Sequence, residues 1–155
     1  MLEFRCEGAP RDLGWDQGRA CHDALRGLRV RGWRARLRGL RLDPQTAALA
    51  RDMRRYFPHQ AEQLEGIARG AGVSFPVLVR AMAATLREPM QSAVVECEDG
   101  LGLACAAPAD AVLRRAYPEG RFPAVELTRP GLTTALAAVN EKGLAVALAG
   151  RFGSR

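Results

Sequence analysis

Two different spacings of apolar residues divide the chain. Between residues 10 and 88, apolar residues recur at intervals of three and four, which predicts amphipathic helices. From residue 92 onwards, apolar and polar residues alternate in short runs separated by turn sequences, which predicts β-strands. The fold class that follows is α+β, with a helical N-terminal half followed by an antiparallel β-meander.

The first helical region begins at Pro10, whose missing N–H is harmless in the first turn of a helix. Glycines at 27, 32 and 39 weaken helical structure, so we expect a kink or two pieces before residue 43. The predicted buried stripe consists of Leu13, Ala20, Ala24 and Leu28, continued by Trp33, Leu37 and Leu40.

Three further helices are predicted before residue 89. The first starts at Asp43-Pro44, the second covers residues 60–69, and the third follows the N-cap Ser74 and ends before Pro89. Gly70 and Gly72 suit the left-handed end of the second. The predicted buried positions are Leu49, Met53 and Tyr56, then Ala61, Leu64, Ile67 and Ala68, then Val77, Leu78, Ala81, Met82, Thr85 and Leu86.

The β-region begins with a hairpin of residues 92–97 and 101–106 around the turn Asp99-Gly100. Residues 107–123, rich in proline and charge, read as a loop. Further strands are predicted at 124–128, 132–139 and 144–149, with Gly143 in a positive-φ turn position, and a short strand at 2–6. We therefore expect a helical segment at 1–89 and an antiparallel sheet at 90–155, packed as one unit.

Chain length, the lengths of apolar runs and the cysteine content together indicate the cellular compartment. A chain of 155 residues is long enough for one core, and it contains no apolar run near the ~18 residues of a membrane span and no signal pattern. The four cysteines form no CxxC pair, and only two histidines are present, so neither a metal site nor a cofactor is expected. The prediction is a cytoplasmic protein with reduced thiols and no membrane association.

The net charge of +6 lies entirely within residues 1–89, and all but one of the 23 basic residues are arginines. Residues 26–41 carry a run of arginines with no acid between them. As a site, Arg29, Trp33 and Arg36 could bind phosphate groups. As structure, they form the solvated face of an amphipathic helix. We favour the structural interpretation, because no nucleic-acid-binding motif accompanies the run.

Three sequence blocks resemble the acyl-CoA:isopenicillin-N acyltransferase-like family of N-terminal-nucleophile (Ntn) hydrolases. The first is EGAPRDLGWDQG, which includes Gly8, Pro10, Gly14 and Gly18. The second is QLEGIARGAGVSFPVLV, similar to the block that precedes the family's cleavage point. The third is RPGLTTALAAVNEKGLAVALAG, similar to a strand pair shared with choloylglycine hydrolases. The resemblance implies the first part of the family's two-sheet sandwich.

The same resemblance implies a nucleophile near residue 90. In such enzymes, self-cleavage frees a cysteine whose thiol attacks an amide or thioester and whose α-amino group is the base. Here Pro89-Met90 stands in place of the family's Gly-Cys, and a thioether has no ionisable proton. An alternative alignment would make Cys97 or Cys105 the nucleophile, although both fall within predicted strands and are better explained as core thiols.

Two other residues match the family in part. Asp110 corresponds to the aspartate that orients the nucleophile's amino group, although the neighbouring arginine and asparagine are missing. Asn140 corresponds to an asparagine of the oxyanion hole in the choloylglycine relatives. Without the resemblance, Asp110 is a turn or cap residue and Asn140 is a hairpin-turn residue.

Three functions remain open from the sequence. The favoured one is a non-catalytic, acyltransferase-like or amidohydrolase-like protein with a binding, regulatory or assembly role, for which a small acyl or amide compound is a candidate ligand. It would act as a homodimer or with a complementing protein chain. The alternatives are a hydrolase or acyltransferase completed by a second chain, and an arginine-driven binder of phosphate or nucleic acid.

Overall fold

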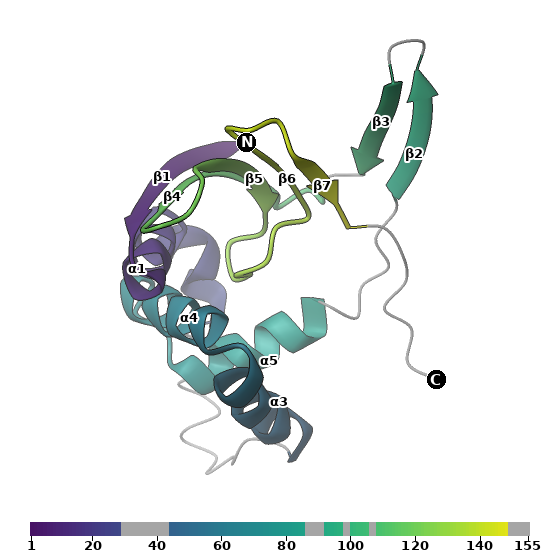
Figure 1. Cartoon of the computed structure of the whole chain (residues 1–155). Coiled ribbons are helices and arrows are strands. Elements are labelled where there is room, and N and C mark those ends of the chain that lie inside the picture. Colours follow the sequence, from purple (N-terminus) through teal and green to yellow (C-terminus); the bar gives the residue numbers. More distant parts are fainter. Residues whose placement is uncertain (29–43, 86–91, 98–99, 106–107, 149–155) are drawn as a thin grey trace.

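The computed structural model describes residues 1–28, 44–85, 92–97, 100–105 and 108–148 (Figure 1). Helices occupy the N-terminal half, and strands follow, apart from one strand at the N-terminus. The predicted α+β class is therefore confirmed. Met90 and the arginine run beyond residue 28, with Arg29, Trp33 and Arg36, lie outside the described residues.

The helices begin where proline permits. α1 (Pro10–Ala20) and α4 (Pro58–Gly70) both carry proline at their start, and α3 (Pro44–Tyr56) also begins at a proline. Residues 22–28 are helical as well. α5 (Phe75–Thr85) follows a turn in which Gly72 has a φ of 63°, so Gly72 adopts the predicted left-handed geometry.

The main sheet has five strands in the order β1-β4-β5-β6-β7, and Figure 1 shows it curving over α1. Its strands are β1 (Leu2–Gly8), β4 (Val112–Pro118), β5 (Ala124–Thr128), β6 (Ala137–Asn140) and β7 (Ala145–Ala147). β4 to β7 form the predicted antiparallel meander, and β1 pairs with β4 in parallel. The first and second halves of the chain therefore share one sheet.

β4 was not predicted, because its seven residues fall in the segment interpreted as a loop. The sequence VLRRAYP alternates in burial, but a buried arginine occupies one of the inward positions. β6 begins five residues later than predicted, since residues 132–136 form a loop that inserts two leucines into the core. β2 (Ser92–Cys97) and β3 (Gly100–Cys105) form a separate hairpin, next to β7.

A single hydrophobic cluster joins the helices to the sheet. Its largest fully buried apolar side chains are Leu64 and Ile67 of α4 and Leu78 and Val79 of α5, and Val112 of β4 extends it into the sheet. Burying each such side chain stabilises the fold by about 1.5–3 kcal/mol. All four predicted buried residues of α4 are buried, whereas Tyr56 of α3, which was predicted to be buried, is 62% exposed.

The predicted buried stripe of the first helical region is confirmed at Leu13, which is buried, and at Leu28, which packs against the core, but it was wrong at Ala20 and Ala24, which are exposed. Besides Leu13, the buried face of α1 contains Gln17 and two glycines, and it continues to Cys21. The prediction from apolar spacing failed at these positions because the buried face of α1 consists largely of glycine and glutamine and is not marked by apolar residues. It is buried through close backbone contact on one side and through hydrogen bonds of a polar side chain on the other.

The close contact is between α1 and α4. A Cβ atom added to Gly14 would overlap the backbone carbonyl of Gln63. One added to Gly18, a turn later, would overlap the carbonyl oxygen of Ile67, a turn later on α4. Contacts advance together along both helices, so α1 and α4 run in the same direction.

The glycines of α4 lie equally close to the backbone of α1. A Cβ atom on Gly66 would overlap the carbonyl oxygen of Arg11, and one on Gly70 would overlap that of Trp15. Gly70 is the last residue of α4, as predicted, and it packs against α1, whereas the left-handed geometry is found only at Gly72. The glycines of the two blocks that carry the family resemblance thus have a structural explanation: only residues without a side chain permit this approach.

Candidate functional site

A cavity of about 700 Å³ lies between the inner face of the main sheet and the N-terminal halves of α1 and α4. The strands contribute inward-facing side chains of β4 to β7, and the helices contribute their first two turns. A volume of this size is typical of sites for small molecules. Its polar lining converges on one buried arginine.

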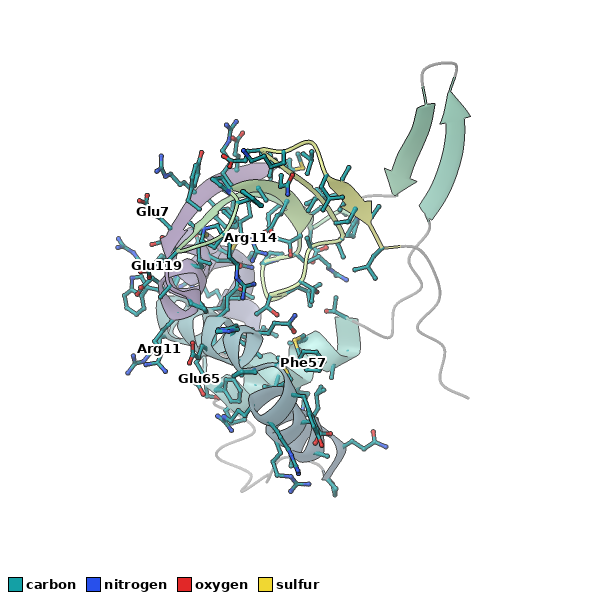
Figure 2. The ribbon with its side chains drawn as sticks, viewed as in Figure 1. Glu7, Arg11, Phe57, Glu65, Arg114 and Glu119 are labelled. Carbon is teal, nitrogen blue, oxygen red and sulfur yellow. The ribbon has the colours of Figure 1, made fainter. Side chains whose placement is uncertain are left out.

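Arg114 of β4 is only 3% exposed, and its guanidinium makes three hydrogen bonds. Its Nε donates to Glu126 Oε2 at 2.5 Å, and its Nη1 donates to Gln17 Oε1 at 2.5 Å. Its Nη2 donates to the carbonyl oxygen of Thr133 at 3.0 Å. Figure 2 shows Arg114 in the interior, on the side of the sheet that faces the helices. Buried charges need such pairing, since an unpaired one is very unfavourable.

Gln17 links this arginine to the loop that precedes β6. The residue is fully buried, and its Nε2 donates to the carbonyl oxygen of Leu132 at 2.9 Å and to that of Pro130 at 3.2 Å. Because its Oε1 accepts from Arg114, its amide is fixed at both ends. Gln17 thereby holds the loop against α1 and determines where Thr133 lies.

Among the described side chains of the cavity wall, only Thr133 has a buried polar atom without a hydrogen-bond partner. It is 6% exposed, and its hydroxyl Oγ1 has no hydrogen-bond partner. Thr128, on the adjacent strand, is also buried, yet its hydroxyl donates to the carbonyl oxygen of Thr134 at 2.8 Å. A buried hydroxyl without a partner costs about 1–3 kcal/mol, so one that lines a cavity indicates a place for a polar ligand.

Further hydrogen-bonding capacity remains at the same place. A guanidinium has five N–H donors, and the three bonds of Arg114 leave two of them. Glu126 uses Oε2 for the arginine and still has Oε1. The inner end of the cavity thus offers donors from Arg114, an acceptor from Glu126, and the hydroxyl of Thr133, which serves as either.

The opposite end of the cavity lies where α1 and α4 begin. It is lined by Gly8 and Pro10 where β1 enters α1, by His59 and Gln60 in the first turn of α4, and by the turn between β4 and β5. That turn is held in place because the backbone N–H of Glu119 donates to the carbonyl oxygen of Gly8 at 3.0 Å. Figure 2 shows Glu119 near the end of β1.

The two described residues that match the family, Asp110 and Asn140, do not come together. Asp110 forms an ion pair with Arg129 at 2.8 Å, beside the C-terminal end of β5. Asn140 pairs with Ala124 at the other end of β5. Neither residue lines the large cavity.

Asn140 has a structural role in its own turn. Its Oδ1 accepts hydrogen bonds from the backbone N–H groups of Lys142 and Leu144, at 3.0 and 2.9 Å. Gly143 has a φ of 81°, as predicted for the turn that joins β6 to β7. These bonds occupy the side-chain oxygen, and the contacts are those of a hairpin-turn asparagine.

The two cysteines with described side chains are buried, which favours their neutral thiol form. Burial raises the pKa of the Cys6 thiol to about 12 and that of the Cys21 thiol to about 11, and nearby Arg114 partly offsets both shifts. Neither forms a disulfide. Cys97 and Cys105, the alternative nucleophiles, lie at opposite ends of the β2–β3 hairpin.

Within the described ranges, no three histidine, cysteine or acidic side chains are grouped so that they could hold a metal ion. No described helix is on its own long and apolar enough to cross a membrane. No family model matches the chain, and no curated protein has a significantly similar sequence. The resemblance to the acyltransferase-like family therefore rests on the three sequence blocks alone.

Sequence reasoning missed the polar network at the inner end of the cavity: Arg114, Glu126 and Thr133, which line it, and Gln17, which bonds to Arg114. One signal was present for Arg114, since an arginine at an inward position of an alternating run requires a buried partner. No local pattern could identify Gln17, whose partners lie about a hundred positions away in the sequence.

Proposed function

We propose that this protein is a non-catalytic relative of the acyltransferase-like Ntn hydrolases, and that it binds a small acyl or amide compound in the cavity. The observation that carries the proposal is the unpartnered Thr133 hydroxyl beside the buried Arg114–Glu126 pair. These groups form one end of a cavity that is large enough for a small molecule.

The arrangement favours an uncharged amide over a carboxylate. The positive charge of Arg114 is already balanced by Glu126, so a second anion at this depth would be unpaired. An amide carbonyl can accept hydrogen bonds from Arg114 and Thr133, and an amide N–H can donate to Glu126. The apolar residues that line the rest of the cavity suit an acyl chain, including Leu13, Ala138 and Leu148.

The proposal of binding without catalysis is supported by the side chains at two places. Among the described residues that line the cavity there is no cysteine or serine. Met90, which occupies the position of the family's nucleophile, cannot form an acyl-enzyme. An intact-mass measurement after incubation with a p-nitrophenyl ester should show no acyl adduct, and an adduct on any side chain would overturn this part of the proposal.

The binding itself can be tested with two probes of similar shape. Hexanamide carries both the acceptor and the donor of an amide, whereas methyl hexanoate lacks the donor. Saturation-transfer NMR should show that hexanamide binds and that methyl hexanoate binds more weakly. Thr133→Val should reduce hexanamide affinity about 3–10-fold, because it removes one hydrogen bond.

A matched control is Thr85→Val, because the Thr85 hydroxyl donates to Ala81 within α5 and the residue does not line the cavity. It should leave hexanamide affinity unchanged. No saturable binding of hexanamide, or equal binding by wild type and Thr133→Val, would contradict the proposal.

We further propose that the protein works in the cytoplasm as a homodimer. Support for the dimer comes from apolar residues on the outer face of β5 and β6 and in the turn after β6 that are 37–65% exposed: Val125, Val139 and Leu144. Light scattering after size exclusion should give a dimer mass, and Val139→Lys should give a monomer. Ala24→Lys, a control at an exposed helical position, should remain dimeric. A monomeric wild type would contradict this part.

A further inference from the structure

A smaller hollow lies on a different side of α4 from the large cavity. Gln63 lines the large cavity and Glu65 lines the hollow, and two positions along a helix correspond to a rotation of about 200°. The hollow has a volume of about 270 Å³, and six residues of α1, α4 and the segment after α4 line it: Arg11, Glu65, Ala68, Arg69, Val73 and Phe75. It is therefore separate from the proposed amide site.

The packing of α1 against α4 gathers the charged residues of the hollow. The carbonyl group of Arg11 lies against Gly66, so Arg11 is beside Glu65, and Figure 2 shows these two residues next to each other. Glu65 and Arg69 are four positions apart and share one face of α4. Two arginines from different helices thus line the same space.

The turn that follows α4 supplies an apolar wall. The backbone N–H of Val73 donates to the carbonyl oxygen of Ala68 at 2.8 Å, which closes the turn and brings Phe75 back toward the helix. Arg54 of α3 lies over the Phe75 ring, 4.4 Å from its centroid, and stabilises the ring in this position. The hollow therefore combines arginines with an aromatic side chain.

The charges at the hollow leave positive charge in excess. Among the described lining residues, Glu65 is the only acid, and its Oε1 accepts two bonds from Arg54, at 3.1 and 3.4 Å. Arg11 makes one long bond to Oε2, at 3.4 Å. Arg69 has no hydrogen-bond or ion-pair partner among the described residues. Three arginines therefore share one carboxylate, which leaves two positive charges unbalanced.

We propose that this hollow binds a phosphate monoester of a small aromatic compound. A phosphate monoester carries a charge of about −1.5 to −2 at neutral pH, which balances the excess, whereas a carboxylate would balance only half of it. The planar guanidinium groups of Arg11 and Arg69 can each donate two N–H groups to phosphate oxygens. The aromatic group packs against Phe75 and the neighbouring apolar residues.

Calorimetric titration with phenyl phosphate tests the site. Wild type should bind this compound saturably, with a submillimolar dissociation constant, and the amide NMR signals of Arg69 and Phe75 should shift. Inorganic phosphate lacks the ring and benzoate lacks the second charge, so each should bind at least about 5-fold more weakly. Equal or tighter binding of either compound would overturn the assigned class of ligand.

Arg69→Gln is the decisive variant. It should weaken phenyl phosphate binding about 10-fold, because it removes charge-assisted hydrogen bonds to the phosphate group. The urea midpoint should stay at the wild-type value, since Arg69 has no partner among the described residues. The matched control is Arg26→Gln, which removes the same charge from an exposed helical position outside the hollow, and it should bind like wild type. Equal binding by wild type and Arg69→Gln would overturn the site.

Glu65→Gln should act in the opposite direction. It removes the negative charge of the wall and releases Arg11 and Arg54, so phenyl phosphate affinity should rise about 3–10-fold. Its effect on stability should be small, because all three side chains are about a third or more exposed. Unchanged or weaker binding would show that the arginines serve only to pair with Glu65, and would contradict the proposal.

Hexanamide separates this site from the large cavity. Saturating hexanamide should leave the affinity for phenyl phosphate unchanged, because the two compounds bind on different sides of α4. Competition between them would place phenyl phosphate in the large cavity and overturn the site. Binding of phenyl phosphate without binding of hexanamide would sustain the site and refute the proposed amide ligand.

Discussion

The two buried sides of α1 are built by opposite means. Toward α4, Gly14 and Gly18 bring backbone against backbone and leave no space. Toward the sheet, Leu13 lines a cavity of about 700 Å³, and Gln17 bonds to the arginine in its wall. The helix is thus fixed rigidly on one side so that it can border an open space on the other. On this one helix, glycines make the packing contacts with α4, and larger side chains face the cavity.

This difference explains why burial alone does not identify the site. Glycines on the packing side have no tolerance for added volume, because the neighbouring atoms are backbone. Polar residues on the cavity side have interactions still to satisfy, most clearly Thr133. Substitutions on the packing side should therefore change stability, whereas those on the cavity side should change ligand binding and stability in separable ways.

The largest effect is expected at the packing side. Gly14→Ala places a methyl group in the backbone of α4 and should destabilise the fold by more than about 4 kcal/mol or prevent folding. Gly27→Ala makes the same change at an exposed helical position with no atom nearby, so it should stabilise by about 0.5–1 kcal/mol. Urea denaturation measures both, and a well-folded Gly14→Ala protein would refute the described helix contact.

Adjacent arginines of β4 provide the next test. Arg114→Met leaves Glu126 partly buried and unpaired, and should cost about 3–5 kcal/mol. Arg115→Met removes an ion pair with Glu3 on the other face, where both side chains are about half exposed, and should cost about 0–1 kcal/mol. Thermal unfolding followed by circular dichroism compares the two. Equal losses would show that Arg114 is not the centre of a buried network.

Two buried threonines should respond in opposite directions to the same substitution. Thr133→Val removes a hydroxyl that has no partner, and should stabilise the unliganded protein by about 1 kcal/mol. Thr128→Val removes a hydrogen bond to the Thr134 carbonyl and should destabilise by about 1 kcal/mol. Chemical denaturation gives both values. A destabilised Thr133→Val protein would mean that this hydroxyl has a partner.

A further test, independent of any substitution, concerns pH. Burial raises the pKa of Cys6 to about 12 and that of Cys21 to about 11, from 9.0 for a free thiol, so the folded state keeps these protons longer than the unfolded state. Stability from this source is complete below pH 9 and decreases as pH rises from 9 toward 12. Urea midpoints at pH 8 and 10.5 measure the loss, and Cys6→Ala should reduce this pH dependence.

Much of the fold could be predicted because local patterns specify it. The bounds of α3 and β5, the turn at Gly143 and the buried face of α4 follow from capping, alternation and periodicity. β4 could not be predicted, because its inward Arg114 reads as a loop residue until its partners are known. The face of α1 was misassigned for the same physical reason: glycine and glutamine are buried there by long-range contacts.

The candidate site was less predictable than the fold. Asp110 and Asn140 were selected through family resemblance, and in the structure each is engaged in local contacts at a different end of β5. The cavity residues come from α1, α4, β4 to β7 and the loop before β6, so they meet only when the sheet closes over the helices. Patterns in a single sequence indicate contacts between residues a few positions apart, and they do not indicate contacts between residues far apart in the sequence.

The parallel pairing of β1 with β4 has a consequence for synthesis on the ribosome. The first strand to emerge cannot find its partner until residues 112–118 have also left the exit tunnel, and contacts of such long sequence separation form slowly. Until then, the nascent helices expose the apolar residues that the sheet later covers. Newly made chains should therefore depend on chaperones during this interval, and a product truncated before residue 112 should aggregate.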